Sequence, residues 1–194
     1  MEIGVTKIVK DRIKTTQIEE IRGDDLVFCW DTHLAKIRGR NVLFIVNASN
    51  RYTIAMTDIE PRNWNYYTLY IWRVIHFAMQ KMGYTDNQID QYFKMSGDTT
   101  VTKTHGKKSV GRINRMVLEA QYYDKKLEKD EKYQWGLSEY LNRDICKPEG
   151  FEAYGYPFEL FKLDMERLGI IQQRKPAKVI DFNRYIEKNQ DVTD

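Results

Sequence analysis

Cysteine and proline are scarce in this chain. Its 194 residues include two cysteines and four prolines. Cys29 and Cys146 lie far apart, and neither belongs to a CxxC or Cys/His spacing that suits zinc. We therefore expect no disulfide framework and no zinc motif. A signal peptide and an apolar run long enough to cross a bilayer are also missing, so we expect a cytosolic, reduced protein with no membrane partner.

Motifs for common cofactors and for metal catalysis are missing too. The sequence has no P-loop lysine motif and no dinucleotide glycine fingerprint, which argues against ATP or NAD chemistry. The acidic pairs Asp24-Asp25 and Asp58/Glu60 are short and typical of turns, without the convergent carboxylate and histidine spacing of a metal nuclease. We expect neither a cofactor nor a metal.

The chain does have enough apolar residues to fold. Hydrophobic residues make up 42% and aromatic residues 13% of the sequence, which argues against general disorder. The thirteen tyrosines favour a recognition surface, because a phenol ring can stack on a base or line an interface. The formal net charge of +3 is too small to require a nucleic-acid partner by itself.

Strand patterns are concentrated in the first hundred or so residues. Runs that alternate in hydrophobicity, or are rich in β-branched and aromatic residues, predict strands over 2–9, 26–34, 41–46, 51–57 and 99–104. The segment Asn47–Asn50 separates two of these runs and predicts a hairpin turn. The three central runs are therefore expected to form an antiparallel meander.

Helical spacing and capping signals follow the meander. Apolar residues recur every three or four positions over 63–82, which predicts a helix that covers the sheet. Thr85 and Gln88 match the capping box of the next helix. Pro157 suits the first turn of a further helix over 158–168.

These patterns predict an α+β fold, with an N-terminal antiparallel sheet covered by helices and a mainly helical C-terminal region. We expect an α+β core domain over residues 1–120. Residues 121–194 are expected to form a helical extension that packs on this core. A chain of this length is long enough to bury a core of its own.

A basic stretch without carboxylates, over 99–117, is the strongest local signal. Gly106 and Gly111 let the backbone turn tightly, and Ser109 is a good N-cap for the amphipathic run after it. Free N–H groups at a helix start, with cations around them, form a phosphate-binding site. The same pattern also fits a strand, a basic turn and a solvated helix start. The nucleic-acid contacts expected in this stretch are Lys103, Lys107, Lys108, Ser109, Arg112, Asn114 and Arg115.

Aromatic residues near other cations offer a second route to nucleic acid. Trp30, Tyr52 and Trp64 are candidates for stacking on unpaired bases, with core packing as the alternative for Trp30. The cations expected to contact phosphates beside them are Arg38, Arg40 and Arg51.

Histidines are the candidate catalytic groups, because metal-free RNA cleavage needs a base, an acid and a cation. His105 lies among lysines, whose charges are expected to lower its pKa and leave a neutral ring that accepts a proton. His33 lies near Lys36 on a predicted strand. If that strand neighbours the one before His105, the two histidines form a catalytic pair. The alternative is that His105 is a loop residue, so the sequence leaves open whether the protein is an enzyme.

Four segments carry a family resemblance. They are Thr6-Lys7, Trp30-Asp31-Thr32-His33-Leu34, Leu43-Phe44-Ile45-Val46-Asn47 and Lys108-Ser109-Val110-Gly111-Arg112-Ile113-Asn114. They resemble a bacterial domain of unknown function found in small proteins of chromosomes, plasmids and phages. The last segment is similar to that family's Arg-Ser-Val-Leu-Gly-Ser-Met-Asn signature. The resemblance spans about residues 1–120 and implies a small α+β domain with no established chemistry.

In general character the chain is also similar to anti-CRISPR proteins of mobile elements, some of which act on the guide RNA of a Cas9 complex. This similarity implies a protein of the bacterial cytoplasm that engages RNA or a ribonucleoprotein, such as a Cas9–guide RNA complex, through its basic loop. Metal-free RNA cleavage by His105 and His33 is a further expectation, which would make the protein a ribonuclease.

The alternative is a non-catalytic protein-interaction module, such as an inhibitor or a toxin–antitoxin partner. In that case the tyrosine-rich helix, which contains Tyr66, Tyr67 and Tyr70, and the C-terminal helices bind another protein. The tyrosine-rich face is equally suited to a homodimer.

Overall fold

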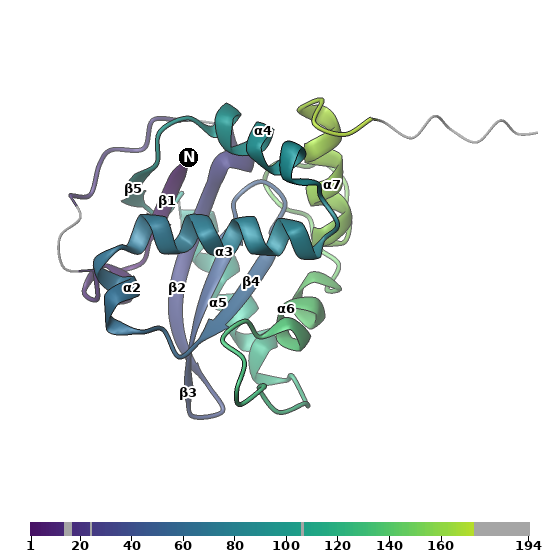
Figure 1. Cartoon of the computed structure of the whole chain (residues 1–194). Helices are drawn as coiled ribbons and strands as arrows, with labels where there is room; N and C mark the ends of the chain where they lie inside the picture. Colours follow the sequence, from purple (N-terminus) through teal and green to yellow (C-terminus); the bar gives the residue numbers. More distant parts are fainter. Residues whose placement is uncertain (14–16, 24, 106, 173–194) are drawn as a thin grey trace, which may run out of the picture.

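A five-stranded sheet lies between two layers of helices (Figure 1). The computed structural model describes residues 1–13, 17–23, 25–105 and 107–172, without the side chains of residues 107–110. The strand order is β4-β3-β2-β1-β5, so the first strand of the chain lies inside the sheet. The expected α+β class is confirmed.

The centre of the sheet is the predicted antiparallel meander. It consists of β2 (Cys29–Ile37), β3 (Arg40–Asn47) and β4 (Thr53–Thr57). The predicted turn between β3 and β4 is also present. Its first residue, Asn47, accepts a hydrogen bond from the backbone nitrogen of Ser49 at 3.0 Å through its side-chain oxygen, which is the means by which asparagine stabilises a turn.

The two remaining strands make the sheet mixed, whereas the sequence predicted an antiparallel one. β1 (Glu2–Val5) pairs in parallel with β2 on one side and with β5 (Thr100–Lys103) on the other. Parallel neighbours need a long connection, and the segments between these strands supply it. The predicted strand over 2–9 is shorter than expected, because the chain turns at Thr6 into the short helix α1 (Lys7–Lys10).

One face of the sheet is covered by helices from both halves of the chain. The elements near or on this face are the short 3-10 turn η1 (Leu26–Phe28), α2 (Pro61–Asn65), α3 (Tyr67–Lys81), α4 (Asp86–Ser96) and α7 (Pro157–Arg167). The predicted capping box of α4 is present, since Thr85 accepts from the backbone of Gln88 and the Gln88 side chain accepts from the backbone of Thr85. Pro157 lies in the first turn of α7, as the sequence predicts.

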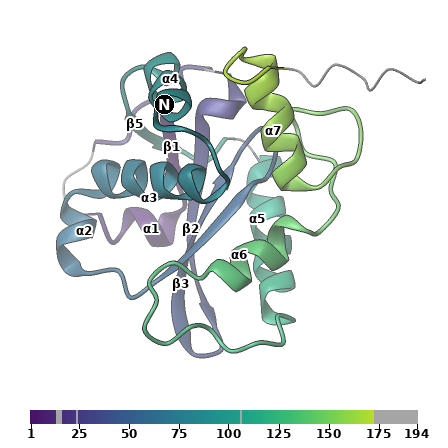
Figure 2. The same cartoon turned by 45° about the vertical axis from the view of Figure 1, so that its right-hand side comes forward.

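The opposite face of the sheet is covered by α5 (Lys107–Gln121) and α6 (Trp135–Asn142), which Figure 2 shows across the sheet from α3. Ile113 and Met116 of α5 pack in one cluster with Phe44 of β3. The helix begins at Lys107, so Ser109 and Gly111 lie inside it. The predictions of an N-cap at Ser109 and of a tight turn at Gly111 were therefore wrong.

The helices of the C-terminal half pack on the sheet from both sides. Phe161 and Met165 of α7 belong to the first core cluster, and Leu137 and Leu141 of α6 belong to the second. The division after residue 120 stays a prediction, and residues 173–194 of the expected extension lie outside the described part of the chain. Among the described residues, no helix is long and apolar enough to span a membrane.

A hydrogen-bonded chain runs through the first core cluster. The indole nitrogen of Trp30 donates to the Tyr92 hydroxyl at 2.9 Å, and this hydroxyl donates to the Val27 carbonyl at 2.7 Å. Trp30 and Tyr92 are buried. The hydroxyl of Tyr92 therefore satisfies two buried polar groups at once.

We predict that Tyr92→Phe lowers the free energy of unfolding by about 1–3 kcal/mol, because the buried Trp30 donor loses its partner, while the Val27 carbonyl keeps its hydrogen bond from Asn47. Urea denaturation followed by circular dichroism measures this loss. Tyr122→Phe is the matched control, since Tyr122 is 69% exposed. Equal stability of the two variants would contradict the prediction.

Candidate functional site

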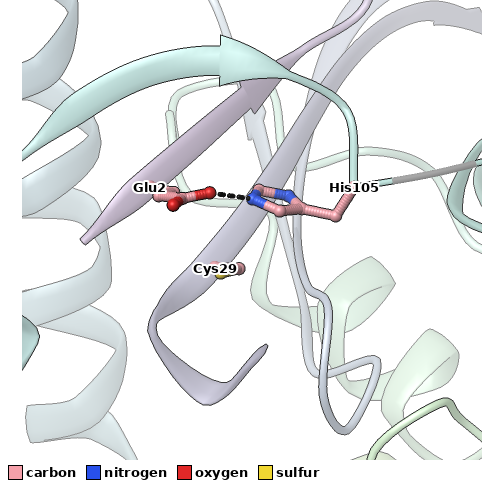
Figure 3. A group of neighbouring side chains, drawn as sticks. All are labelled: Glu2, Cys29 and His105. Carbon is pink, nitrogen blue, oxygen red and sulfur yellow. Dashed lines mark hydrogen bonds and ion pairs between the residues drawn. The ribbon is translucent and has the colours of Figure 1, made fainter. Parts of the chain in front are cut away.

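Polar residues meet on one face of β1, β2 and the segment after β5. In the parallel register Glu2 lies opposite Cys29, and Gly4 lies opposite Asp31. Side chains two apart on a strand share a face, so Glu2, Cys29 and Asp31 gather on the same side of the sheet. His105 follows β5, and Figure 3 shows its ring directed at Glu2, with Cys29 beside them.

His105 is held between two carboxylates. Its Nδ1 lies 2.7 Å from Asp31 Oδ1, and its Nε2 lies 2.8 Å from Glu2 Oε2. The backbone nitrogen of His105 also donates to Asp31 Oδ1, at 3.1 Å. The side chains of His105, Asp31 and Glu2 are 4%, 2% and 0% exposed, so these contacts are shielded from water.

Gly4 makes room for this arrangement. A Cβ atom at Gly4 would lie 1.9 Å from Asp31 Oδ1 and 3.0 Å from the Thr104 Cα. No side chain fits in that space. A glycine on β1 therefore lets the Asp31 carboxylate lie across the strand and reach His105.

The electrostatics of His105 are the reverse of the prediction from sequence. Burial opposes protonation of the ring, but the contacts with Asp31 and Cys29 outweigh it and raise the pKa of His105 to about 11. The neighbouring lysines in the sequence were expected to lower this pKa, and that expectation was wrong. The strands bring carboxylates from distant segments within hydrogen-bond distance of the ring, and the nearest charges dominate.

Glu2 has a second set of partners. The backbone nitrogen of Arg22 donates to Glu2 Oε1 at 2.7 Å, and Arg22 Nε lies 3.6 Å from the same oxygen. Burial raises the pKa of Glu2, but the hydrogen bonds from His105 and Arg22 outweigh burial, and the pKa falls below its ordinary value. The carboxylate is therefore charged, with each of its oxygens engaged.

Glu2, Cys29 and His105 are also the described residues that can hold a metal ion. A carboxylate oxygen, the thiol sulfur and a ring nitrogen all lie within 4.8 Å of one another. The sequence shows no motif for this group, because its members are separated by 27 and by 76 positions. Only the pairing of β1 with β2 and β5 brings them together.

His33 has a different environment from His105. It lies in the middle of β2, where its Nδ1 is 3.1 Å from the Thr6 hydroxyl oxygen. The catalytic pair depended on the strand of His33 lying next to the strand before His105, and this condition is not met, because β1 lies between β2 and β5. In the described part of the chain, no hydrogen bond joins His33 to His105. Burial lowers the pKa of His33.

The predicted basic loop is only partly described. Lys103 and Asn114 are exposed, while the side chains of Lys107, Lys108 and Ser109, and the whole of Gly106, lie outside the described residues. The remaining cations have acidic neighbours. Arg112 is paired with Glu149, and Arg115 Nε lies 3.8 Å from Glu119.

A shallow hollow lies beside these residues on α5. Its volume is about 490 Å³, and Arg112, Arg115 and Lys147 line it together with Glu149 and Phe151. Three cations against one carboxylate make the hollow positive. This hollow contains the part of the predicted phosphate-binding site that the structure describes, namely Arg112 and Arg115.

Two of the other predicted cations lie away from this surface. Arg38 and Arg40 lie at the turn between β2 and β3, where Arg38 donates to the Asp124 carbonyl at 3.1 Å and Arg40 pairs with Asp58 at 2.5 Å. Arg51 lies at the turn between β3 and β4, at the opposite end of β3, where it contacts Cys146, the neighbour of Lys147 in the chain. A single basic patch containing all the predicted arginines is therefore excluded.

The aromatic residues expected to stack on bases are mostly in the core. Trp30 is 1% exposed and Tyr52 is 3% exposed, so neither ring is free to stack on a base. The alternative of core packing is confirmed for Trp30. Trp64 is half-buried and stacks on Tyr67, with ring centroids 5.9 Å apart.

A groove that the sequence did not indicate lies at the β4 edge of the sheet, between the end of α3, α6 and α7. Its volume is about 310 Å³. Trp135 and Phe158 line it and are 41% and 42% exposed. Tyr52 and Tyr84 also line it. We call this feature the aromatic groove.

Positive charge surrounds the aromatic groove. Lys81, Arg143 and Lys162 line it, and Glu139 is the one carboxylate among the lining residues of the described chain. Arg143 donates to Glu139 at 2.7 Å and remains 70% exposed. Half-exposed aromatic rings with cations around them fit a flat, apolar ring that carries a negative charge.

Comparison with known proteins identifies the family. The model of the family described as Domain of unknown function (DUF6933) matches residues 2–160, and the protein belongs to this family. The expectation of an uncharacterised family is thus confirmed, while the similarity to anti-CRISPR proteins stays a prediction. The search of curated proteins and the search of solved structures found no match.

We predict that Gly4→Ala lowers the free energy of unfolding by about 3–5 kcal/mol, because the added methyl group pushes Asp31 away from His105 and separates a buried ion pair. Urea denaturation measures the loss. Gly111→Ala is the matched control, since no atom lies within 4 Å of its Cβ position and alanine stabilises a helix interior by up to about 1 kcal/mol. A Gly4→Ala protein as stable as the wild type would show that the Asp31 carboxylate does not need the space left by Gly4.

The lowered pKa of His33 predicts a dependence of stability on pH. The folded protein binds a proton at His33 less tightly than the unfolded chain does. The free energy of unfolding therefore has its full value above the unfolded pKa of about 6.5, and it declines as the pH falls below that value. We expect His33→Gln to lose less stability than the wild type between about pH 7 and pH 5. Urea denaturation at both pH values measures the difference, and equal losses would contradict the assignment.

Proposed function

We propose that this protein binds single-stranded RNA without cleaving it, and that an unpaired base enters the aromatic groove. The observation that carries the proposal is the pair of half-exposed rings, Trp135 and Phe158, which line the groove together with three cations. A nucleotide has a flat base that can stack on the aromatic rings and a negatively charged phosphate that the cations can bind.

Stacking supplies the energy of such a contact. Every base has a π-face, and stacking on an aromatic side chain is worth about 1–3 kcal/mol per base. The phosphates beside the base lie within the field of Lys81, Arg143 and Lys162, which line the same groove. Lysine and arginine side chains neutralise phosphates and release counterions, so the affinity falls as salt rises.

The hollow on α5 offers a second contact for the RNA backbone. Arg115 is 68% exposed there, and Lys147 lines the same hollow. Lys103 at the end of β5 adds an exposed cation from the predicted basic stretch. These groups support the original expectation that RNA contacts this stretch, now as a backbone contact rather than a catalytic one.

The environment of His105 supports binding without cleavage. Both ring nitrogens face carboxylates, and the ring is a cation over the whole neutral range because its pKa is raised to about 11. A cationic imidazole has no lone pair with which to accept a proton. The ring is also shielded, with 4% of its side chain exposed.

A guide RNA held by a Cas9-type effector is one member of this ligand class, and inhibition of such an effector is the finer form of the proposal. The second candidate is a protein partner. The exposed Tyr66 and Leu69, which are 69% and 46% exposed near the start of α3, favour it as an interface for another protein or for a second copy of the chain.

We predict that Trp135→Ala weakens binding of a fluorescein-labelled single-stranded RNA by about 5- to 150-fold, the equivalent of one stacked base. Fluorescence anisotropy at several salt concentrations measures the dissociation constant, with free guide RNA and a Cas9–guide complex as additional ligands. Tyr122→Ala is the matched control, because Tyr122 is 69% exposed and lies outside the groove.

Wild-type affinity in Trp135→Ala would remove the groove from the proposal. Absence of RNA binding by the wild-type protein at low salt would leave the protein-partner candidate. Cleaved RNA after incubation in EDTA, with loss of cleavage in His105→Ala, would contradict the non-catalytic assignment.

A further inference from the structure

We propose that Glu2, Cys29 and His105 form a zinc-binding site (Figure 3). Each residue offers one ligand atom, and the three atoms lie within 4.8 Å of one another. Ligands bound to one tetrahedral Zn²⁺ ion lie about 3.3–3.8 Å apart, given bond lengths of about 2.0–2.3 Å. Shifts of the side chains by a fraction of that distance complete the site. None of the three residues lines the aromatic groove, so this inference is independent of RNA binding.

The orientation of the His105 ring is the first supporting observation. Histidines that bind metals almost always donate their second ring N–H to a carboxylate or a carbonyl, which fixes the tautomer and the ring plane. Asp31 is this partner here, because its Oδ1 lies 2.7 Å from Nδ1. The other nitrogen, Nε2, then points at Glu2 Oε2, 2.8 Å away, where the ion inserts. Asp31 is a positioning residue.

The orientation of Glu2 is the second supporting observation. The backbone nitrogen of Arg22 donates to Glu2 Oε1 at 2.7 Å. This bond holds one oxygen and leaves Oε2 facing the ring of His105. Both oxygen and nitrogen ligands therefore have the outer hydrogen-bond partners that metal centres use to fix their ligands.

The chemistry of the ligands selects the metal. A thiolate and an imidazole suit Zn²⁺, whereas Mg²⁺ and Ca²⁺ prefer sites made of oxygen atoms alone. The ion takes the place of the thiol proton of Cys29 and of the proton on Nε2. Its two positive charges and the Arg22 guanidinium then balance the three negative charges of Glu2, Cys29 and Asp31. A water molecule suits the fourth tetrahedral position.

Zinc at this position links three segments that are distant in the sequence. Glu2 belongs to β1, Cys29 begins β2, and His105 lies between β5 and α5. The unfolded chain does not hold these ligands together, so zinc binds the folded state and raises its stability. The ion therefore holds the start of α5 against the sheet.

Cobalt and zinc titrations of the full chain test this proposal. Protein treated with EDTA and then freed of chelator is titrated with Co²⁺, whose bond to a thiolate gives an intense charge-transfer absorption in the near ultraviolet. We expect this band in the wild type and in Cys146→Ser, the matched control at the other buried cysteine, and its loss in Cys29→Ser. One equivalent of Zn²⁺ should displace the Co²⁺. Asp31→Asn should weaken zinc binding about 10- to 100-fold, measured by competition with a chromophoric chelator.

The absorption spectrum of the wild-type protein with Co²⁺ tests the zinc site even if a variant fails to fold. A wild-type protein that shows no thiolate-to-cobalt band, or a band that Cys29→Ser keeps, overturns the site. A band that Cys146→Ser removes also overturns it. A rise in the melting temperature on addition of Zn²⁺, absent with Mg²⁺, supports it.

Discussion

The contact of His105 with Asp31 and Glu2 is the interaction on which the arrangement of this molecule depends. Buried charges are tolerated only when they are paired and hydrogen-bonded, and removal of one partner leaves a charge that water cannot reach. Asp31 and Glu2 belong to adjacent strands, and His105 follows a third. The pairing therefore requires β1 to lie between β2 and β5, with Gly4 free of a side chain. This is the same geometry that brings the zinc ligands together.

The two proposed binding features occupy different parts of the sheet. The aromatic groove lies at the β4 edge, where helices of both layers meet, and its lining comes from α3, α6 and α7. The cluster of Glu2, Cys29 and His105 lies at the other side, over β1, β2 and the start of α5. The groove is open and carries the exposed aromatic rings, so it suits a ligand that binds reversibly. The cluster is buried, so it suits an ion that stays with the folded protein.

Local signals were read correctly wherever neighbours in the sequence decide the structure. The turn Asn47–Asn50, the capping box of Thr85 and the first-turn position of Pro157 each depend on a few consecutive residues, and all three are present. The start of α5 was misplaced, because the basic residues before Ser109 form helix as readily as loop. The direction of β1 relative to its neighbours was also missed, since it depends on residues a hundred positions away.

The sequence by itself determined the α+β class, the central meander, the approximate bounds of α3 and α7 and the start of α4, because periodicity and capping act over a few residues. It also identified His105 and the cations near it as residues to examine. Only the tertiary structure decided the charge of His105 and its partners, the split of the predicted basic patch, and the aromatic groove. The reason is that electrostatic and packing energies depend on distance in space. The carboxylates that hold His105, and several residues that line the groove with Trp135, come from segments far away in the chain.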